Sequence, residues 1–401
     1  YVFSLYPQEK MWYNTKILII LSVVVYNIPC GYKTTIYLLP LNLHPGGLLM
    51  QLPELKKRKW NYTALAFATP ATVLLVMMFI TSVAPFGEYT MLYSDMYHQY
   101  FPFFKEFREA LRSGDSLLWT WSVGGGMDYL GMISYYLSSP LNLLSVLVPD
   151  QFVLDYFTLL TPIKLSLASG FFAIMLKKLY GRDDLSLVLF GSFYGLCAWG
   201  LGYQWNIMWV DTFALLPLVA LGTILLLRDK KYILYTITLA LSVFANYYVG
   251  FFVCIFVLLL FFCYELCRFK SIGRFFLDFV RIGIFTVLAI GMTAILSLPT
   301  LASLGTTSSG NNVFPKKFEL NIVDKDNFLG LLEGMKQVAT NTFSMVEPNY
   351  VATEGLPNIY CGVFSVLFAV LFLSAKQIKL RDKICSVFLL LFFSLSFIIR
   401  Q

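Results

Sequence analysis

Charged residues and histidines are scarce in this sequence. Lys, Arg, Asp and Glu make up 13% of the 401 residues, and only two histidines are present. A soluble domain carries about 25% charged residues, so this composition, with 58% hydrophobic residues, excludes an ordinary soluble fold. Because a helix needs about 20 apolar residues to cross a bilayer, we divide the chain into membrane spans rather than soluble domains.

Cysteine patterns and basic runs of the kind found in metal-binding or nucleic-acid-binding proteins are also missing. The seven cysteines form no CxxC pair and no metal-ligand spacing. Most fall in or beside apolar runs, where cysteine packs as a small hydrophobic side chain. The net charge of +7 comes from short clusters of Lys and Arg between apolar runs. Such clusters are typical of the cytoplasmic loops of membrane proteins, so no nucleic-acid partner, disulfide framework or metal cluster is predicted.

Apolar segments dominate the chain from Ala64 onward and predict an all-α, polytopic transmembrane bundle of about nine spans. The segments are 64–83, 152–176, 184–202, 211–228, 232–246, 249–267, 275–297, 358–375 and 383–400. If they alternate, all five basic clusters between or before them fall on one side, which is then cytoplasmic. The apolar stretch 129–148 is broken by Gly131 and by Ser138-Ser139-Pro140. We interpret it as an interfacial or re-entrant hairpin, because a tenth span would invert every later loop.

The two ends of the chain differ from this pattern. Residues 1–49 contain one short apolar run and no periodicity, whereas Met50 opens a basic flank of the kind that precedes a first span. We expect residues 1–49 to be upstream sequence or, as the alternative, a signal or anchor segment. Residues 50–401 would then form the membrane domain, with a cytoplasmic N-terminus, and the final apolar run suggests truncation.

Two long loops, 84–151 and 298–357, are predicted on the outer face and are long enough to carry function. Within the first, residues 102–112 predict a short helix on the membrane surface. Phe103, Phe104, Phe107 and Leu111 would form its apolar face, with Arg108 among the charged residues of the other face.

Asp95 is the first candidate for chemistry. It lies where the chain leaves the first span, about one helical turn before His98 and Gln99. An acidic residue before a helical run is commonly an N-cap, but Ser94 could supply that cap. The carboxylate could instead act as general base toward a hydroxyl or hold a divalent ion that carries a phosphate. His98, three residues on, is either structural or a partner of Asp95 or of a phosphate.

Other polar and aromatic residues of the outer face complete the candidate site. Gly124-Gly125-Gly126 lacks the lysine and the strand–loop–helix setting of a nucleotide site, so we interpret it as a turn that admits a ligand closely. Asp211 opens the fourth span, where an ionisable residue is either functional or a favourable charge at a helix start. The candidate substrate-binding residues are His98, Gln99, Trp121, Gly125, Asp128, Asn206, Asp211, Asn246 and Tyr247.

Five motifs together make the chain resemble the bacterial YfhO family of multi-pass membrane proteins. They are PFG…SDMYHQYFPF (85–104), W…GGGMDY (119–129), YYLSSPLNLL (135–144), WNIMWVDTFALLPLVALG (205–222) and NYYVGFF (246–252). The resemblance implies a fold like that of type C glycosyltransferases, which take sugars from polyprenyl phosphate on the outer membrane face. It also implies glycosylation of teichoic acids in Gram-positive bacteria, with Asp95 at the position of the essential Asp of the first outer loop.

The mechanism that the resemblance implies is an inverting transfer. An acceptor hydroxyl deprotonated by Asp95 attacks the anomeric carbon, and polyprenyl phosphate departs. The implied partners are a polyprenyl-phosphate-linked sugar, a teichoic acid-type polymer and membrane lipid. No cofactor is assigned, and a divalent metal (Mg²⁺ or Mn²⁺) is left open.

A transporter or flippase of lipid-linked envelope precursors is the alternative. Such a protein is expected to place charged residues inside its spans. Here nearly all lie at span edges; Lys164 is the exception, and its long side chain could snorkel toward the interface.

Overall fold

The computed structural model describes residues 60–305 and 363–395. This part of the chain is helical apart from one two-stranded sheet, so the predicted all-α class is confirmed. Residues 1–49, and the second outer loop beyond Gly305, lie outside the described residues.

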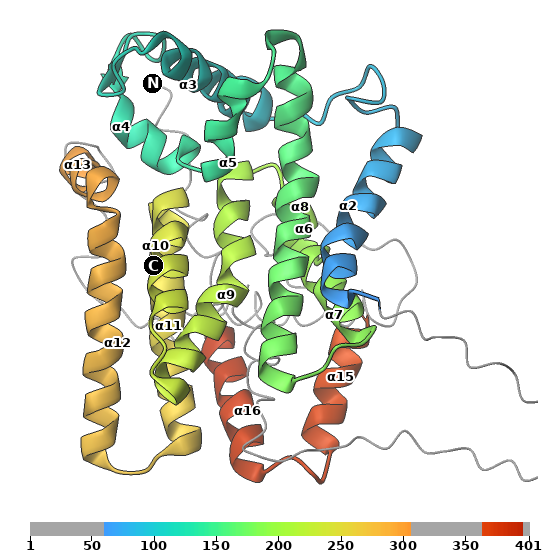
Figure 1. The fold of residues 1–401 in the computed structure, drawn as a ribbon, viewed down its shortest axis with the longest axis vertical. Coiled ribbons are helices and arrows are strands. Elements are labelled where there is room, and N and C mark those ends of the chain that lie inside the picture. Colours follow the sequence, from blue (N-terminus) through green and yellow to red (C-terminus); the bar gives the residue numbers. More distant parts are fainter. Residues whose placement is uncertain (1–59, 306–362, 396–401) are drawn as a thin grey trace, which may run out of the picture.

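Eleven of the described helices form the body of the molecule (Figure 1). They are α2 (Tyr62–Ile80), α6 (Val153–Tyr180), α7 (Ser186–Gly195), α8 (Ala198–Gly202), α9 (Ile207–Asp229), α10 (Ile233–Ala245), α11 (Tyr247–Arg268), α12 (Ile272–Met292), α13 (Ala294–Leu304), α15 (Val363–Ser374) and α16 (Leu380–Leu395). Among the described residues, five helical segments are long and apolar enough to cross a membrane. They are Tyr62–Ile80, Asp150–Tyr180 (which includes α6), Ile207–Asp229, Tyr247–Arg268 and Ile272–Met292.

The other predicted spans are shorter or only partly described. The segment 184–202 is divided between α7 and α8, and 232–246 forms the 13-residue α10. Both fall below the length that a helix needs to cross a bilayer alone. The segment 275–297 ends earlier than predicted, at Met292, and α13 follows it. Segments 358–375 and 383–400 are described only as α15 and α16.

Burial separates the central helices from the peripheral ones. In the most apolar stretch of α9, 89% of the residues are buried, against 17% in α2 and in α12. α9 packs against α6, α10 and α11, and it supplies much of the core. The exposed apolar faces of α2 and α12 suit contact with lipid, since hydrocarbon tails are as apolar as leucine.

The basic turns lie at one end of the bundle. The turns between α6 and α7, α9 and α10, α11 and α12, and α15 and α16 are together at the lower end in Figure 1. They carry Lys177, Lys178, Arg182, Arg228, Lys230, Lys231, Arg268, Lys270, Arg274, Lys376, Lys379, Arg381 and Lys383. The opposite end is covered by α3, α4, α5 and α13, so the described basic loops and the first long loop occupy opposite ends, as predicted.

Short elements build the covering layer. They are the π-helical turn η2 (Met96–Tyr100), α3 (Phe101–Ser113), β1 (Trp119–Thr120), β2 (Met127–Asp128), α4 (Tyr129–Met132), η3 (Ile133–Leu137), α5 (Pro140–Leu143), η4 (Leu144–Leu147) and η5 (Asp150–Phe152). The strands pair antiparallel, with Trp119 opposite Asp128.

The helix predicted at 102–112 is present as α3, but its surroundings differ from the prediction. Arg108, assigned to the charged face, is buried; its Nε donates to the carbonyl of Ser145 at 2.9 Å. Its guanidinium also pairs with Asp150 at 2.7 Å. On the other side Phe104 packs on Phe157 of α6, with ring centroids 5.1 Å apart. The helix therefore lies on protein, because its neighbours supply both an apolar partner and acceptors for Arg108.

Residues 129–148 are broken where their composition predicts a break. Tyr129–Leu137 and Pro140–Leu147 meet at an angle of 110°, and we call them the bent pair. Ser138 and Ser139 occupy the break, where Pro140 begins the second half with no amide hydrogen to donate. The geometry is that of a broken span or a re-entrant loop.

Candidate functional site

Asp95 begins the π-helical turn η2. Its half-buried side chain makes no capping hydrogen bond, so the N-cap interpretation is wrong. Ser94 begins the helical turn through its backbone: its carbonyl oxygen accepts from the amides of Tyr97 at 3.1 Å and His98 at 3.2 Å. π-helical turns are rare and frequently occur at functional sites.

Tyr100 joins Asp95 to Asn206. Its hydroxyl oxygen lies 3.4 Å from Asp95 Oδ2 and 3.1 Å from Asn206 Oδ1, and Asn206 is buried. Two predicted site residues, 111 positions apart by their numbers, are thus brought together by a third residue that we did not select. The sequence signal for Tyr100 is its five-residue spacing from Asp95, which matches the i to i+5 step of a π-helix rather than the step of an α-helix.

Aromatic rings surround this contact. The Tyr100 ring stacks on Trp205 at 6.3 Å with an interplanar angle of 14°, and lies 5.7 Å from Tyr136. Tyr93 approaches Trp205 from the other side at 5.9 Å. Partial desolvation raises the pKa of Tyr93, so its phenol keeps its proton at neutral pH. These rings form an aromatic cluster around the tyrosine that contacts the Asp95 carboxylate.

His98 and Gln99 lie on the same turn but differ in surroundings. His98 is exposed and packs edge to face on Tyr97, with ring centroids 5.1 Å apart. Gln99 Oε1 is buried and has no hydrogen-bond partner within the described residues. A buried acceptor without a partner is costly, so this oxygen is suited to a hydroxyl brought by a ligand.

The tryptophans and glycines form a hairpin next to α3. Gly124, Gly125 and Gly126 all have positive φ (61°, 80° and 115°), so the predicted turn is confirmed. The Trp119 and Trp121 rings pack edge to face at 5.5 Å, and Trp121 is 77% exposed. At Gly126 a Cβ would lie 2.8 Å from the Trp121 ring, so only glycine lets this indole lie flat on the hairpin.

The hairpin lies against α3 on one strand and against the bent pair on the other. Thr120 Oγ1 donates to Glu106 Oε1 of α3 at 3.0 Å. Asp128 ends the second strand and directs its carboxylate toward Gly131, the third residue of the bent pair. The candidates Trp121, Gly125 and Asp128 therefore belong to one rigid element.

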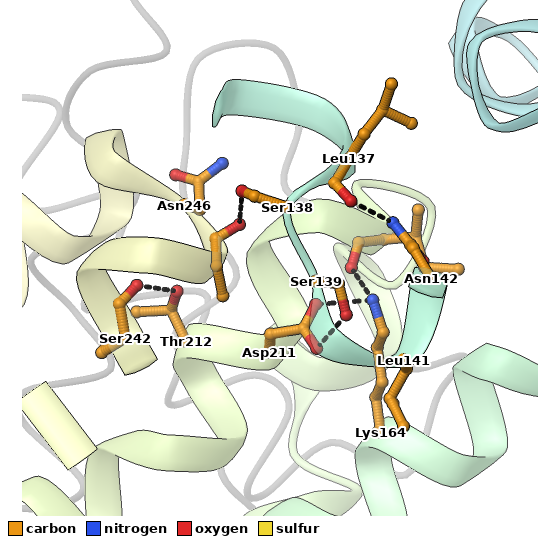
Figure 2. A network of polar contacts seen from close by, with 12 residues as sticks. Leu137, Ser138, Ser139, Leu141, Asn142, Lys164, Asp211, Thr212, Ser242 and Asn246 are labelled. Carbon is orange, nitrogen blue, oxygen red and sulfur yellow. Dashed lines mark hydrogen bonds and ion pairs between the residues drawn. The ribbon is translucent and has the colours of Figure 1, made fainter. Parts of the chain in front are cut away.

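Asp211 is buried in the second turn of α9. Because α9 begins at Ile207, Asp211 is beyond the first turn, and the helix-start interpretation is wrong. Its Oδ2 accepts from Lys164 Nζ at 2.6 Å and its Oδ1 from Ser139 Oγ at 2.7 Å (Figure 2). Lys164 is 1% exposed, so it does not snorkel; the nearby carboxylate compensates its charge within the protein.

Asn246 and Tyr247 hold the bent pair in place. Asn246 is fully buried; its Oδ1 accepts from the amide of Val249 at 2.8 Å and its Nδ2 donates to the carbonyl of Tyr135 at 2.7 Å. The amide thus caps α11 and binds the bent pair, so its groups are engaged by the chain itself. Tyr247 lies beside Tyr135, with ring centroids 5.9 Å apart.

The described residues contain no group of three or more His, Cys, Asp and Glu side chains that could hold a metal ion. A divalent ion at Asp95 would therefore need further ligands from water or from the phosphate of a substrate.

These features define a multi-pass helical membrane protein with a bent helix pair and a half-buried carboxylate at one end of its bundle. Residues 66–401 match the family described as bacterial membrane protein YfhO, and the chain belongs to that family. No curated protein and no solved structure matches the sequence.

Proposed function

We propose that this protein is a glycosyltransferase of the cell membrane. It transfers a sugar from a polyprenyl-phosphate donor to a teichoic acid-type polymer on the outer face, with Asp95 as general base. The observation that carries the proposal is the position of Asp95. Its carboxylate caps no helix and directly precedes the covering layer opposite the basic turns. It contacts the hydroxyl of Tyr100, which also contacts Asn206.

The proposed sugar transfer needs one carboxylate, which accepts the proton of the acceptor hydroxyl. The acceptor hydroxyl oxygen forms a bond to the anomeric carbon while its proton passes to Asp95. The bond from that carbon to the phosphate oxygen breaks, and the electron pair leaves with polyprenyl phosphate. Attack from the face opposite the leaving group inverts the configuration. A phosphate leaving group needs no general acid, so the protein must mainly stabilise its negative charge.

The described residues offer groups for each part of the donor. Gln99 Oε1 can accept from a sugar hydroxyl, and the exposed ring of Trp121 offers a flat face to a sugar. His98 and the backbone amides of Gly124 and Gly125 are candidates for the phosphate, because all three residues are exposed. The amide of Gly126 already donates to the carbonyl of Val123 at 2.9 Å. The polyprenyl chain would approach from the bilayer beside the bent pair.

The test is transfer of labelled sugar from polyprenyl phosphate by the full-length protein reconstituted in lipid. Replacing Asp95 with Asn keeps shape and hydrogen bonding but removes the base, so we expect a loss of rate of about 10²-fold or more. Asp115→Asn is the matched control, because Asp115 is an exposed carboxylate of the same outer segment. Equal rates for Asp95→Asn and wild type would refute the assigned base.

Transport of lipid-linked precursors is the second candidate, and the Lys164–Asp211 pair favours it. Ionisable residues within a bundle often mark transport pathways. A flippase would move fluorescent polyprenyl-phosphate sugar between leaflets of vesicles without forming a glycosidic bond. A transferase would require the acceptor and release polyprenyl phosphate, so the two activities separate in one assay.

A further inference from the structure

A buried ion pair connects the bent pair to the centre of the bundle. Lys164 of α6 and Asp211 of α9 lie 2.6 Å apart (Nζ to Oδ2) and are 1% and 8% exposed. Ser139, at the break of the bent pair, donates to the other Asp211 oxygen at 2.7 Å. Figure 2 shows both donors directed at the Asp211 carboxylate, so one carboxylate holds both α6 and the bent pair.

The same lysine also holds the beginning of α9. Its Nζ donates to the carbonyl of Ile207, the first residue of that helix, at 2.9 Å. The preceding residue is Asn206, which contacts the Tyr100 hydroxyl, and that hydroxyl contacts Asp95. A continuous series of contacts therefore runs from the ion pair to the candidate base.

Stability alone does not account for an ion pair at this depth. Taking two charges out of water is costly, and well-packed apolar residues of similar volume are often as stabilising or more so. The documented use of such pairs is to select one arrangement among several. Here the arrangement concerns two elements that meet at this pair: the break of the bent pair and the start of α9.

We propose that Lys164 and Asp211 are positioning residues that set the geometry of the Asp95 site. The pair fixes Asn206 through Ile207, and it fixes the bent pair through Ser139. For its catalytic part the inference rests on the proposed transferase function. Its structural part, the local ordering of these two segments, does not.

The decisive variant replaces both partners, Lys164→Met with Asp211→Leu, because removing one alone leaves an unpaired buried charge. We expect the melting temperature to stay near that of wild type, since no charge remains buried. Amide hydrogen exchange in 133–143 and 203–210 should rise about tenfold or more, because both segments lose their anchor. In the transfer assay kcat should fall about tenfold with little change in KM, since misplacement of the base affects the chemical step more than binding.

A second variant tests the contact with the bent pair separately, and a third serves as the control. Ser139→Ala leaves the ion pair intact, so exchange should rise in 133–143 and stay unchanged in 203–210. The matched control is Lys177→Met with Asp183→Leu. This removes an exposed pair of 3.0 Å that also has its lysine on α6, and it should leave both segments and kcat unchanged.

Hydrogen exchange and the melting temperature together distinguish a positioning role of the ion pair from a purely stabilising one. Wild-type exchange in both segments of the double variant would overturn the proposal. So would faster exchange throughout α6 and α9 with a lowered melting temperature, since the pair would then serve stability alone. If wild type transfers no sugar, the proposed function fails, and the exchange data still decide whether the pair orders the bent pair and the start of α9.

Discussion

At the scale of single residues, the candidate site depends on which polar groups the fold already uses. Asn246 gives both ends of its amide to the backbone, and Asp211 accepts from two side chains. Gln99, by contrast, has an oxygen without a hydrogen-bond partner in the described part of the chain, and Asp95 caps no helix. The hydrogen-bond partners of these polar residues thus distinguish Asn246 and Asp211, which stabilise the scaffold, from Gln99 and Asp95, which are suited to a substrate.

Tyr100→Phe tests the contact with Asp95. The change removes the hydroxyl and keeps the ring that stacks on Trp205, so the fold should persist. A hydrogen bond to a charged group is worth about 1.5–3 kcal/mol, and we therefore expect the transfer rate to fall by about tenfold or more. The measurement is kcat of the reconstituted protein. Tyr97→Phe, an exposed tyrosine of the same turn, is the control and should retain the wild-type rate.

At the scale of elements, close approach of helices decides where the short α10 lies. Gly222 of α9 faces the backbone of Tyr235 in α10, where an added Cβ would lie 2.6 Å from the Tyr235 nitrogen. Small residues at such crossings let two helix backbones meet, which is a common packing device in membranes. α10 is therefore held by its neighbours even though it has only 13 residues.

Gly222→Ala should separate the two helices. Backbone atoms on the far side cannot rotate away, so we expect destabilisation of about 1–3 kcal/mol and a lower melting temperature in detergent. Gly283→Ala in α12 is the control, because nothing lies within 4 Å of its added Cβ. In a helix that change is favourable by about 1 kcal/mol. Equal melting temperatures for the two variants would contradict the close contact.

At the scale of the whole molecule, the bundle has one end with basic turns and another covered by the first long loop (Figure 1). The positive-inside rule then assigns the covered end, with Asp95, to the outer face. The proposed chemistry requires this orientation, because the acceptor polymer lies outside the cell.

Single cysteines report this orientation. With the native cysteines replaced, Asp115→Cys should react with a membrane-impermeant maleimide on intact cells. Asp183→Cys, in the turn between α6 and α7, should react only after the membrane is permeabilised. Both aspartates are exposed, so the comparison depends on sidedness. The reverse pattern would place Asp95 in the cytoplasm and contradict the proposed site of transfer.

The sequence by itself determined the features that depend on local composition. Long apolar runs specify the main spans, the three glycines specify a turn with positive φ, and Ser138-Ser139-Pro140 specifies the break of the bent pair. Each follows from the solubility or the backbone freedom of neighbouring residues, so no distant contact is needed to predict it.

Tertiary structure alone decided which distant side chains meet. Lys164 pairs with Asp211 across 47 positions, and Tyr100 reaches Asn206 across 106. Arg108 is buried because carbonyls 37 and 40 residues away accept its hydrogen bonds. A charged residue has the same local sequence whether it faces water or a buried partner. Helix packing supplies the partner that compensates the desolvation cost of a buried charge. The partner therefore decides whether the residue belongs to the scaffold or to the site.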